Sequence, residues 1–213
     1  MAYGEAGAAE VFGADLAVGH AAASTEYAGR KKREFGWGFS VADASALPFP
    51  DRSFDTVIAN DAMEHFAEPE PAVREMSRVT KKGGAIWLFF TPHYSPLGSH
   101  LYDYVYTPWC HLMFRRQSLK GAIRKVLRTR EPECETAEIE RKLGQIMTSY
   151  DNDLNHMSIG WFKRIIGNHP ELKVVYEEFK PAKFTALKPL TRIPYVRELV
   201  TGTVICQLER VTD

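Results

Sequence analysis

The sequence has few cysteines, no excess of either charge and no long apolar run, and each shortage argues against a class of protein. Its 213 residues include only Cys110, Cys134 and Cys206, an odd and widely spaced set that predicts neither a disulfide framework nor a zinc site. The 27 Lys and Arg balance 27 Asp and Glu, so we expect no nucleic-acid partner. No apolar run approaches about 18 residues and no secretory signal opens the chain, so we expect no integral membrane association. Reduced thiols in a cytoplasmic protein fit this composition.

The composition is that of an ordinary globular domain. Hydrophobic residues make up 45% of the chain and charged residues 25%, which excludes a disordered or fibrous protein. The length fits one domain with elaborations. Little chain precedes the first recognisable strand, because only 14 residues stand before Asp15.

The first half of the chain alternates predicted strands with predicted helices. Short apolar runs predict strands at residues 10–15, 37–41, 54–59 and 85–90. An Ala-rich stretch at 19–28, closed by the basic cluster 30–33, predicts one helix. Helical spacing at 71–79, followed by Lys81-Lys82-Gly83-Gly84, predicts a second. This alternation predicts a parallel sheet covered by helices.

The second half changes character. Residues 93–114 are rich in Tyr, Trp and Pro, and two helices are predicted at 118–130 and 133–147. A shorter helix is predicted at 158–168 with Ser158 as its N-cap. Two closing strands are predicted at 173–179 and 203–208, joined by an irregular Pro-containing segment at 181–197. The basic side chains of the helix at 118–130 are interpreted as a solvated face.

Three blocks of the first half resemble a known family. They run from Ala42 to Ile58, from Asp61 to Phe66 and from Arg74 to Gly84. In order and spacing they resemble class I S-adenosylmethionine-dependent methyltransferases, and within these the family called methyltransferase type 11. The resemblance covers residues 7–92 and weakens beyond residue 93.

The resemblance implies a cofactor site for S-adenosylmethionine. Asp15, which ends a predicted strand and is followed by Leu16, would accept hydrogen bonds from the ribose hydroxyls. Asp43 would accept from the adenine amino group, and the backbone N–H of Ala44 would bond a ring nitrogen. Asn60 would line the site at the carboxyl edge of the sheet. The competing interpretation makes each of these a turn or loop residue.

One part of the family pattern is missing. The resemblance implies a first strand and a glycine-rich loop, placing the ribose acid roughly 20 residues beyond the first loop glycine. We therefore expect a chain that lacks this strand and loop, with two sheet edges facing a gap and with weak or absent cofactor binding. In an alternative reading, residues 12–21 are a degenerate strand and loop with Gly19 as the loop glycine.

Catalysis and metal binding are assigned to one short segment. Glu64 and His65 follow a predicted strand and are the candidate catalytic residues, since methyl transfer needs a positioned and deprotonated acceptor. The pattern Asp61-x-x-Glu64-His65 also resembles methyltransferases that hold a divalent ion. Because Glu-His is common here in metal-free relatives and Asp61 departs from the usual Glu, we expect no metal. The aromatic segment 94–114 reads equally as a lid over an acceptor pocket or as a second core layer.

The sequence thus predicts an α/β, Rossmann-like, doubly wound and mostly parallel sheet, with helices on both faces and a helical, aromatic insertion before the last two strands. We expect one domain over residues 1–213, with a cofactor half at 1–92, an insertion at 93–170 and closing strands at 171–213. The expected activity is S-adenosylmethionine-dependent methyl transfer to a small-molecule acceptor. A non-catalytic, methyltransferase-like scaffold and a nucleotide-binding oxidoreductase are the alternatives.

Overall fold

A computed structural model describes residues 7–19, 26, 36–182 and 185–212. The helix predicted at 19–28 and the basic cluster 30–33 lie almost entirely outside these residues. The three cysteines are free thiols, and Cys110 and Cys206 are buried, as the sequence predicts. In the described part of the chain, no helix has the length and apolar character that crossing a membrane requires.

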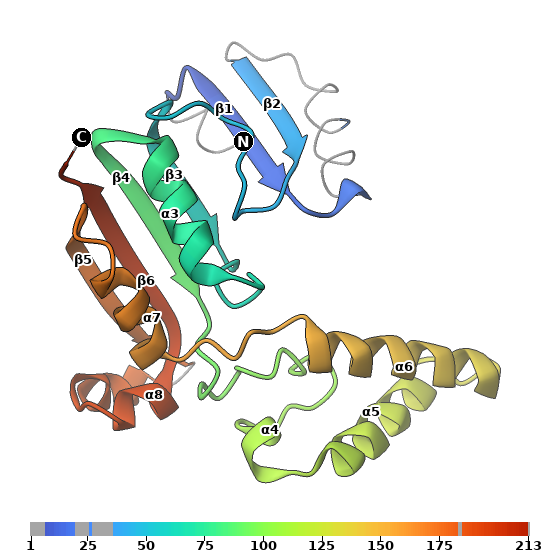
Figure 1. Ribbon diagram of the computed structural model, residues 1–213. Coiled ribbons are helices and arrows are strands. Elements are labelled where there is room, and N and C mark those ends of the chain that lie inside the picture. The colour runs from blue at the N-terminus through green and yellow to red at the C-terminus, as the bar shows by residue number, and fades with distance from the viewer. Residues whose placement is uncertain (1–6, 20–25, 27–35, 183–184, 213) are drawn as a thin grey trace.

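The strands form two separate sheets (Figure 1). The first pairs β1 with β2 in parallel, and the second has the order β3-β4-β6-β5. In the second sheet β3 and β4 are parallel, whereas β6 runs antiparallel to both of its neighbours. The strands are β1 (Glu10–Asp15), β2 (Gly36–Val41), β3 (Phe54–Asn60), β4 (Thr80–Phe90), β5 (Leu172–Pro181) and β6 (Thr201–Arg210).

The α/β class is confirmed, and the sheet is more mixed than the sequence predicts. Half of the pairings between the described strands are antiparallel, because β6 runs antiparallel to both β4 and β5. The longer connection between β5 and β6 holds the 3-10 helix η1 (Thr185–Arg192) and α8 (Val196–Val200), where the sequence predicts only an irregular segment.

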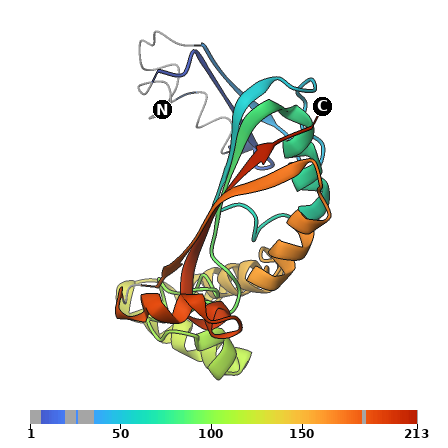
Figure 2. The same cartoon turned by 90° about the vertical axis from the view of Figure 1, so that its left-hand side faces the viewer.

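Two helices cover one face of the four-stranded sheet, as the side view shows (Figure 2). They are α3 (Pro69–Val79) and α7 (Ile159–Gly167). Alternate residues of β4, namely Ile86, Leu88 and Phe90, are buried beneath them. This period-two burial on one face, met by apolar residues at helical spacing, forms the main core. Ser158 caps α7 as predicted, accepting a bond from the Trp161 N–H at 3.0 Å.

A second core lies between two helices that extend away from the sheet (Figure 1). These are α5 (Arg116–Arg130) and α6 (Thr136–Asn152), with the short α4 (Cys110–Met113) before them. Leucine and isoleucine side chains of α5 and α6 pack there against Leu101 and Cys110 of the aromatic segment. Part of that segment is therefore a second core layer, one of the two readings that the sequence left open.

Candidate functional site

The carboxyl ends of β1 and β2 carry the two predicted cofactor acids. Asp15 ends β1, and the Ala42 N–H after β2 donates to the Asp15 carbonyl at 3.1 Å, which makes the two strand ends neighbours. The Asp15 Oδ1 accepts from the Ala17 N–H, and the Asp43 Oδ1 accepts from the Ser45 N–H, both at 2.8 Å. Each acid thus closes an Asx turn that fixes its carboxylate at the sheet edge.

The electrostatics keep Asp43 ionised. Its Oδ1 also accepts from the Ser45 hydroxyl at 2.8 Å, and these bonds lower the pKa of the Asp43 carboxyl below its usual value. A carboxylate is an acceptor only, which suits it to bind amino or hydroxyl donors. Ala44 lies half-buried in the following turn, and Leu16 is 70% exposed.

The third predicted cofactor residue lies on the other sheet. Asn60 ends β3, and its side-chain amide donates to Asp61 Oδ2 at 2.9 Å. Asp61 adopts a left-handed φ of 47°, and its N–H donates to the Phe89 carbonyl of β4. The structure therefore brings Asp15 and Asp43 together and places Asn60 at the end of a strand that is not paired with theirs.

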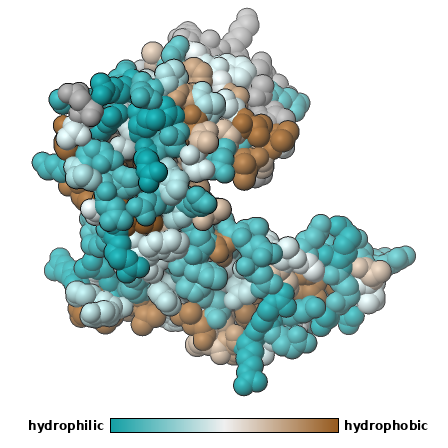
Figure 3. Space-filling model, viewed as in Figure 1, coloured by the Kyte–Doolittle hydropathy of each residue, from teal (hydrophilic) through white to brown (hydrophobic). Residues whose placement is uncertain are grey.

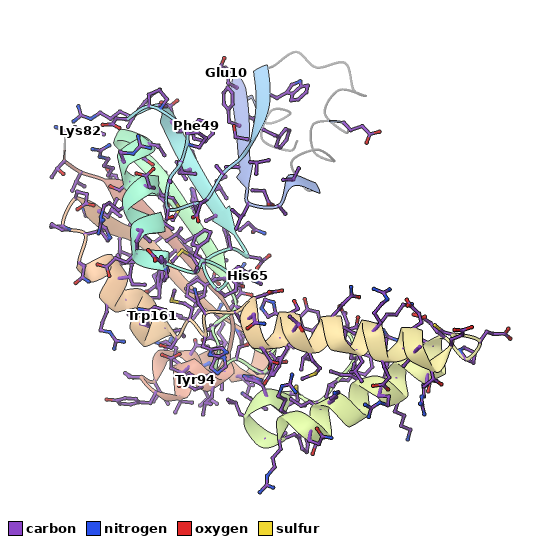
Figure 4. All side chains as sticks on the ribbon, turned by 45° about the vertical axis from the view of Figure 1, so that its right-hand side comes forward. Glu10, Phe49, His65, Lys82, Tyr94 and Trp161 are labelled. Carbon is purple, nitrogen blue, oxygen red and sulfur yellow. The ribbon has the colours of Figure 1, made fainter. Side chains whose placement is uncertain are left out.

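An aromatic cluster bridges the two sheets. The ring of Phe12 on β1 lies 6.1 Å from those of both Phe49 and Phe54, centroid to centroid. Phe49 and Phe54 meet edge to face at 4.9 Å, and Figure 4 shows Phe49 between the strands. Apolar surface gathers at the ends of β1 and β2, where Leu16, Val18 and Val41 are exposed (Figure 3).

Arg78 of α3 anchors the loop between the two sheets, and sequence reasoning missed this role. Its guanidinium donates to the carbonyls of Leu47 and Phe49 and to the carboxylates of Asp51 and Glu75, at 2.7–3.0 Å. These acceptors raise the pKa of Arg78. The i, i+3 pair Glu75 and Arg78 was the available signal, but nothing in the sequence indicated the loop carbonyls.

Glu64 is buried below the turn that follows β3. Its side chain is 3% exposed, and Oε1 accepts from the Thr91 N–H at 3.1 Å. Its Oε2 is buried without a hydrogen-bond partner among the described residues. Burial raises the pKa of the Glu64 carboxyl, and the Thr91 N–H opposes that rise.

His65 is exposed next to Glu64, and Figure 4 shows it where the four-stranded sheet meets the end of α6. Its Nδ1 lies 2.7 Å from the carbonyl oxygen of Asp153. Because a carbonyl only accepts, Nδ1 carries the proton and Nε2 offers a lone pair. This is the tautomer that a base or a metal ligand requires.

Two further residues complete this site, and sequence reasoning missed both. The imidazole of His100 lies 5.2 Å from that of His65, centroid to centroid, and its Nε2 is 3.8 Å from Glu64 Oε1. Burial and the neighbouring His65 lower the pKa of His100. The Asn155 side-chain amide holds the turn by donating to the carbonyls of Met63 and Phe66 at 2.7 and 2.9 Å. Neither residue is near Glu64 in sequence, so no local pattern could reveal them.

A cavity of about 360 Å³ opens beside His65 and His100. Its walls come from the aromatic segment and from α6, and include Leu101, Tyr104 and Tyr150. Apolar walls with a few polar groups are typical of small-molecule sites. Part of the aromatic segment therefore also lines a cavity, and the reading of this segment as a lid or acceptor pocket stays a prediction.

A second histidine cluster joins His93, which directly follows β4, with His111 and with His156, which follows α6. The His93 ring lies 4.4 Å from His156 and 5.0 Å from His111. His111 Nε2 donates to the His93 carbonyl at 2.7 Å. Burial and the two neighbouring imidazoles lower the pKa of His93 to about 4.

Comparison with known proteins identifies the first part of the chain. Residues 1–88 match a family model described as a methyltransferase domain. Over 77 residues the chain is 38% identical to a demethylmenaquinone methyltransferase of Renibacterium salmoninarum, covering 35% of this chain and 32% of that one. Over 67 residues it is 40% identical to the uncharacterized methyltransferase YcgJ of Bacillus subtilis, covering 32% and 26%. The alignments thus span a third or less of these curated relatives.

The likeness in fold extends further along the chain. The crystal structure of YcgJ from Bacillus subtilis matches with a TM-score of 0.54 at 16% identity, covering 96% of this chain and 84% of that one. An S-adenosylmethionine-dependent methyltransferase from Mesorhizobium loti matches with a TM-score of 0.57 at 12% identity, covering 97% and 82%. Residues 1–88 are thus similar to the methyltransferase domain family, and the chain as a whole shares the Rossmann-like fold of these solved structures.

Proposed function

We propose that this protein transfers a methyl group from S-adenosylmethionine to a small-molecule acceptor. The single observation that carries the proposal is the pair of carboxylates, Asp15 and Asp43, fixed at the adjoining carboxyl ends of two parallel strands within the family-matched residues. Ligands of open α/β sheets bind at this edge. Bound S-adenosylmethionine would supply the electrophilic methyl group.

The chain's own residues would divide the binding task. Asp15 would accept from the ribose hydroxyls, with Leu16 packing beside it. Asp43 would accept from the adenine amino group, and the Ala44 N–H would bond a ring nitrogen. Asn60 would close the site from the end of β3. Acceptor carboxylates and a backbone donor match the hydrogen-bonding groups of adenosine.

His65 is the proposed base for the acceptor. His65 lines the cavity, and the Asp153 carbonyl holds the ring in the tautomer whose Nε2 carries the lone pair. Glu64 is too buried to contact an acceptor in the open part of the cavity, so we propose that it positions the turn and the neighbouring imidazoles.

The acceptor is proposed to be a flat, largely apolar molecule. The cavity wall includes Tyr104, Tyr150 and Leu101, which suit an aromatic or quinoid ring. The names of two relatives, the demethylmenaquinone methyltransferase and a ubiquinone/menaquinone C-methyltransferase of Hahella chejuensis, say that those proteins act on quinone precursors. Quinone-like rings are therefore the first acceptors to test.

We expect the cofactor to bind weakly. Its proposed ligands lie on two sheets whose strands are not paired with each other, so the site is not fully preorganised. Titration calorimetry of the whole chain with S-adenosylmethionine should give a Kd weaker than about 1 µM.

Site variants test the assignment of the two acids. Asp43→Ala should lower the affinity about tenfold or more by removing a charge-assisted acceptor. Asp55→Ala is the matched control, because Asp55 is an exposed acid at the other end of β3, paired with Lys81 at 2.8 Å. If Asp43→Ala and wild type bound S-adenosylmethionine with equal affinity, the proposed cofactor role of Asp43 would be wrong.

A non-catalytic, methyltransferase-like scaffold is the second candidate, and the split sheet favours it. A scaffold that lost the cofactor predicts no calorimetric signal with S-adenosylmethionine at millimolar concentration. The scaffold also predicts no methyl transfer to quinone-like acceptors. The enzyme proposal predicts both a calorimetric signal and methyl transfer.

A further inference from the structure

Three potential metal ligands lie together beside the cavity, and two of them, His65 and His100, line it. Glu64, His65 and His100 each offer a ligand atom, and these atoms lie within 4.8 Å of one another. They come from two distant segments, the turn after β3 and the aromatic segment. Their meeting is thus a property of the fold rather than of one sequence motif.

The buried carboxylate points to a missing partner. Glu64 is only 2% exposed, and its Oε2 has no hydrogen-bond partner in the described part of the chain. A buried acceptor of this kind is costly to leave unpaired. The nearest imidazole, that of His100, lies 3.8 Å from Oε1, beyond hydrogen-bond distance, so it does not pair with the carboxylate, whereas a cation shared by the three side chains would.

The hydrogen bond that orients the His65 imidazole is of the kind found in metal sites. His65 donates its Nδ1–H to the Asp153 carbonyl at 2.7 Å, which leaves Nε2 free to ligate. A metal-bound histidine usually donates its other ring N–H to a carbonyl or carboxylate in this way. His100 has a left-handed φ of 53°, a backbone conformation that costs free energy for a non-glycine residue.

Asp61 does not belong to this set. Its carboxylate accepts from the Asn60 amide at 2.9 Å, and His100 provides the third ligand instead. The geometry therefore differs from the Asp61-x-x-Glu64-His65 arrangement that the sequence raised, and from the expectation of no metal.

We propose that Glu64, His65 and His100 bind a divalent first-row transition metal, with Zn²⁺ as the reference ion. Two imidazoles and one carboxylate suit such ions better than Mg²⁺, which prefers oxygen ligands. Three protein ligands leave at least one coordination position open, and two of these ligands, His65 and His100, also line the cavity. An oxygen of the methyl acceptor would occupy the open position, and with the metal bound the ion would polarise that oxygen in place of His65, whose Nε2 would then be a ligand and no longer a base. This last step rests on the proposed function, whereas metal binding does not.

Zn²⁺ binding by the whole chain tests the site. Competition with a chromophoric chelator, without cofactor, should show one Zn²⁺ per chain. His100→Gln should weaken that affinity about tenfold or more, and Glu64→Gln should do the same. His156→Gln is the matched control, because His156 belongs to the second histidine cluster. Circular dichroism should show that His100→Gln, whose parent side chain is 29% exposed, keeps the fold.

A second readout separates ligation from structural effects. On Zn²⁺ addition, imidazole ¹⁵N resonances of His65 and His100 should shift, and those of His93 and His111 should not. Binding that survives His100→Gln, or that His156→Gln abolishes, would overturn the proposal. So would the absence of Zn²⁺ binding by wild type. The Zn²⁺ titrations contain no cofactor, and the S-adenosylmethionine titrations are run with a chelator that removes Zn²⁺. Each result therefore tests its own proposal, and one can fail without the other.

Discussion

The two sheets differ sharply in how deeply their side chains are buried. In the four-stranded sheet, Leu88, Val204 and Leu208 are fully buried. In the two-stranded sheet every residue is exposed or half-buried, and Phe12 is 45% exposed. In this two-stranded sheet aromatic rings lie over glycines instead: Phe12 is opposite Gly38, and Phe39 is opposite Gly13.

This difference divides the proposed site. The proposed cofactor acids Asp15 and Asp43 lie at the ends of the weakly buried strands, whereas Glu64 and His65 follow β3 of the well-buried sheet and lie beside His100. Local stability follows buried apolar contacts. We infer that the acceptor side of the site is preformed and that the cofactor side becomes ordered when ligand binds.

The largest expected effect comes from the main core. Leu88→Ala removes a fully buried side chain and should lower the free energy of unfolding by about 2–5 kcal/mol. Urea unfolding followed by circular dichroism measures it. A loss below about 1 kcal/mol would mean that the four-stranded sheet is not the stable unit.

Lowering the pH should lower the free energy of unfolding of the part that holds the four-stranded sheet, because His93 takes up a proton on unfolding. Its pKa is about 4 in the folded protein and about 6.5 when unfolded. The unfolded state therefore binds the extra proton as the pH falls from 6.5 towards 4, and stability is lost across that window. We expect a loss of about 1–2 kcal/mol, since the imidazole is only partly buried. The urea midpoint of His93→Gln should depend less on pH than that of wild type; equal slopes would contradict this cause.

Arg78→Ala should loosen the connection between the sheets. It removes the donors to two loop carbonyls and two carboxylates, at a cost of about 1–2 kcal/mol because the network is partly exposed. Amide exchange should rise in the loop at residues 42–53 and stay unchanged in β6. Arg74→Ala on the same helix is the control.

The smallest effect is expected in the two-stranded sheet. Phe12→Ala should lower the free energy of unfolding by less than about 1 kcal/mol, because the ring is nearly half exposed. It should nevertheless weaken cofactor binding, since Phe12 contacts both Phe49 and Phe54 across the gap. If Phe12→Ala lowered the free energy of unfolding as much as Leu88→Ala does, the two sheets would not differ in stability as proposed.

Local patterns predicted most of the secondary structure. The run at 10–15 coincides with β1, and those at 54–59 and 85–90 lie within β3 and β4. Helix α3 ends at Val79 as predicted, but its C-cap is the extended Thr80, and the predicted stop residues Lys81 to Gly84, with Gly83 at a φ of 73°, belong to β4. These signals succeed because apolar periodicity and backbone constraints act over a few residues.

The sequence did not predict the contacts between residues that lie far apart in the chain. His100, Asn155 and the loop contacts of Arg78 join segments that lie far apart in sequence. The family resemblance pointed to Asp15, Asp43, Glu64 and His65, but it could not show that Glu64 is buried or that His100 approaches it. Such contacts depend on how elements pack, and no periodicity encodes them.

Hydrogen exchange of the wild-type chain, with and without S-adenosylmethionine, tests the division of the site most directly. Without cofactor, amides of β1 and β2 should exchange much faster than those of β4 and β6. Saturating cofactor should slow exchange at residues 10–15 and 36–46 and leave β4 and β6 unchanged. Equal protection of the two sheets, or no slowing around Asp15 and Asp43, would contradict the account.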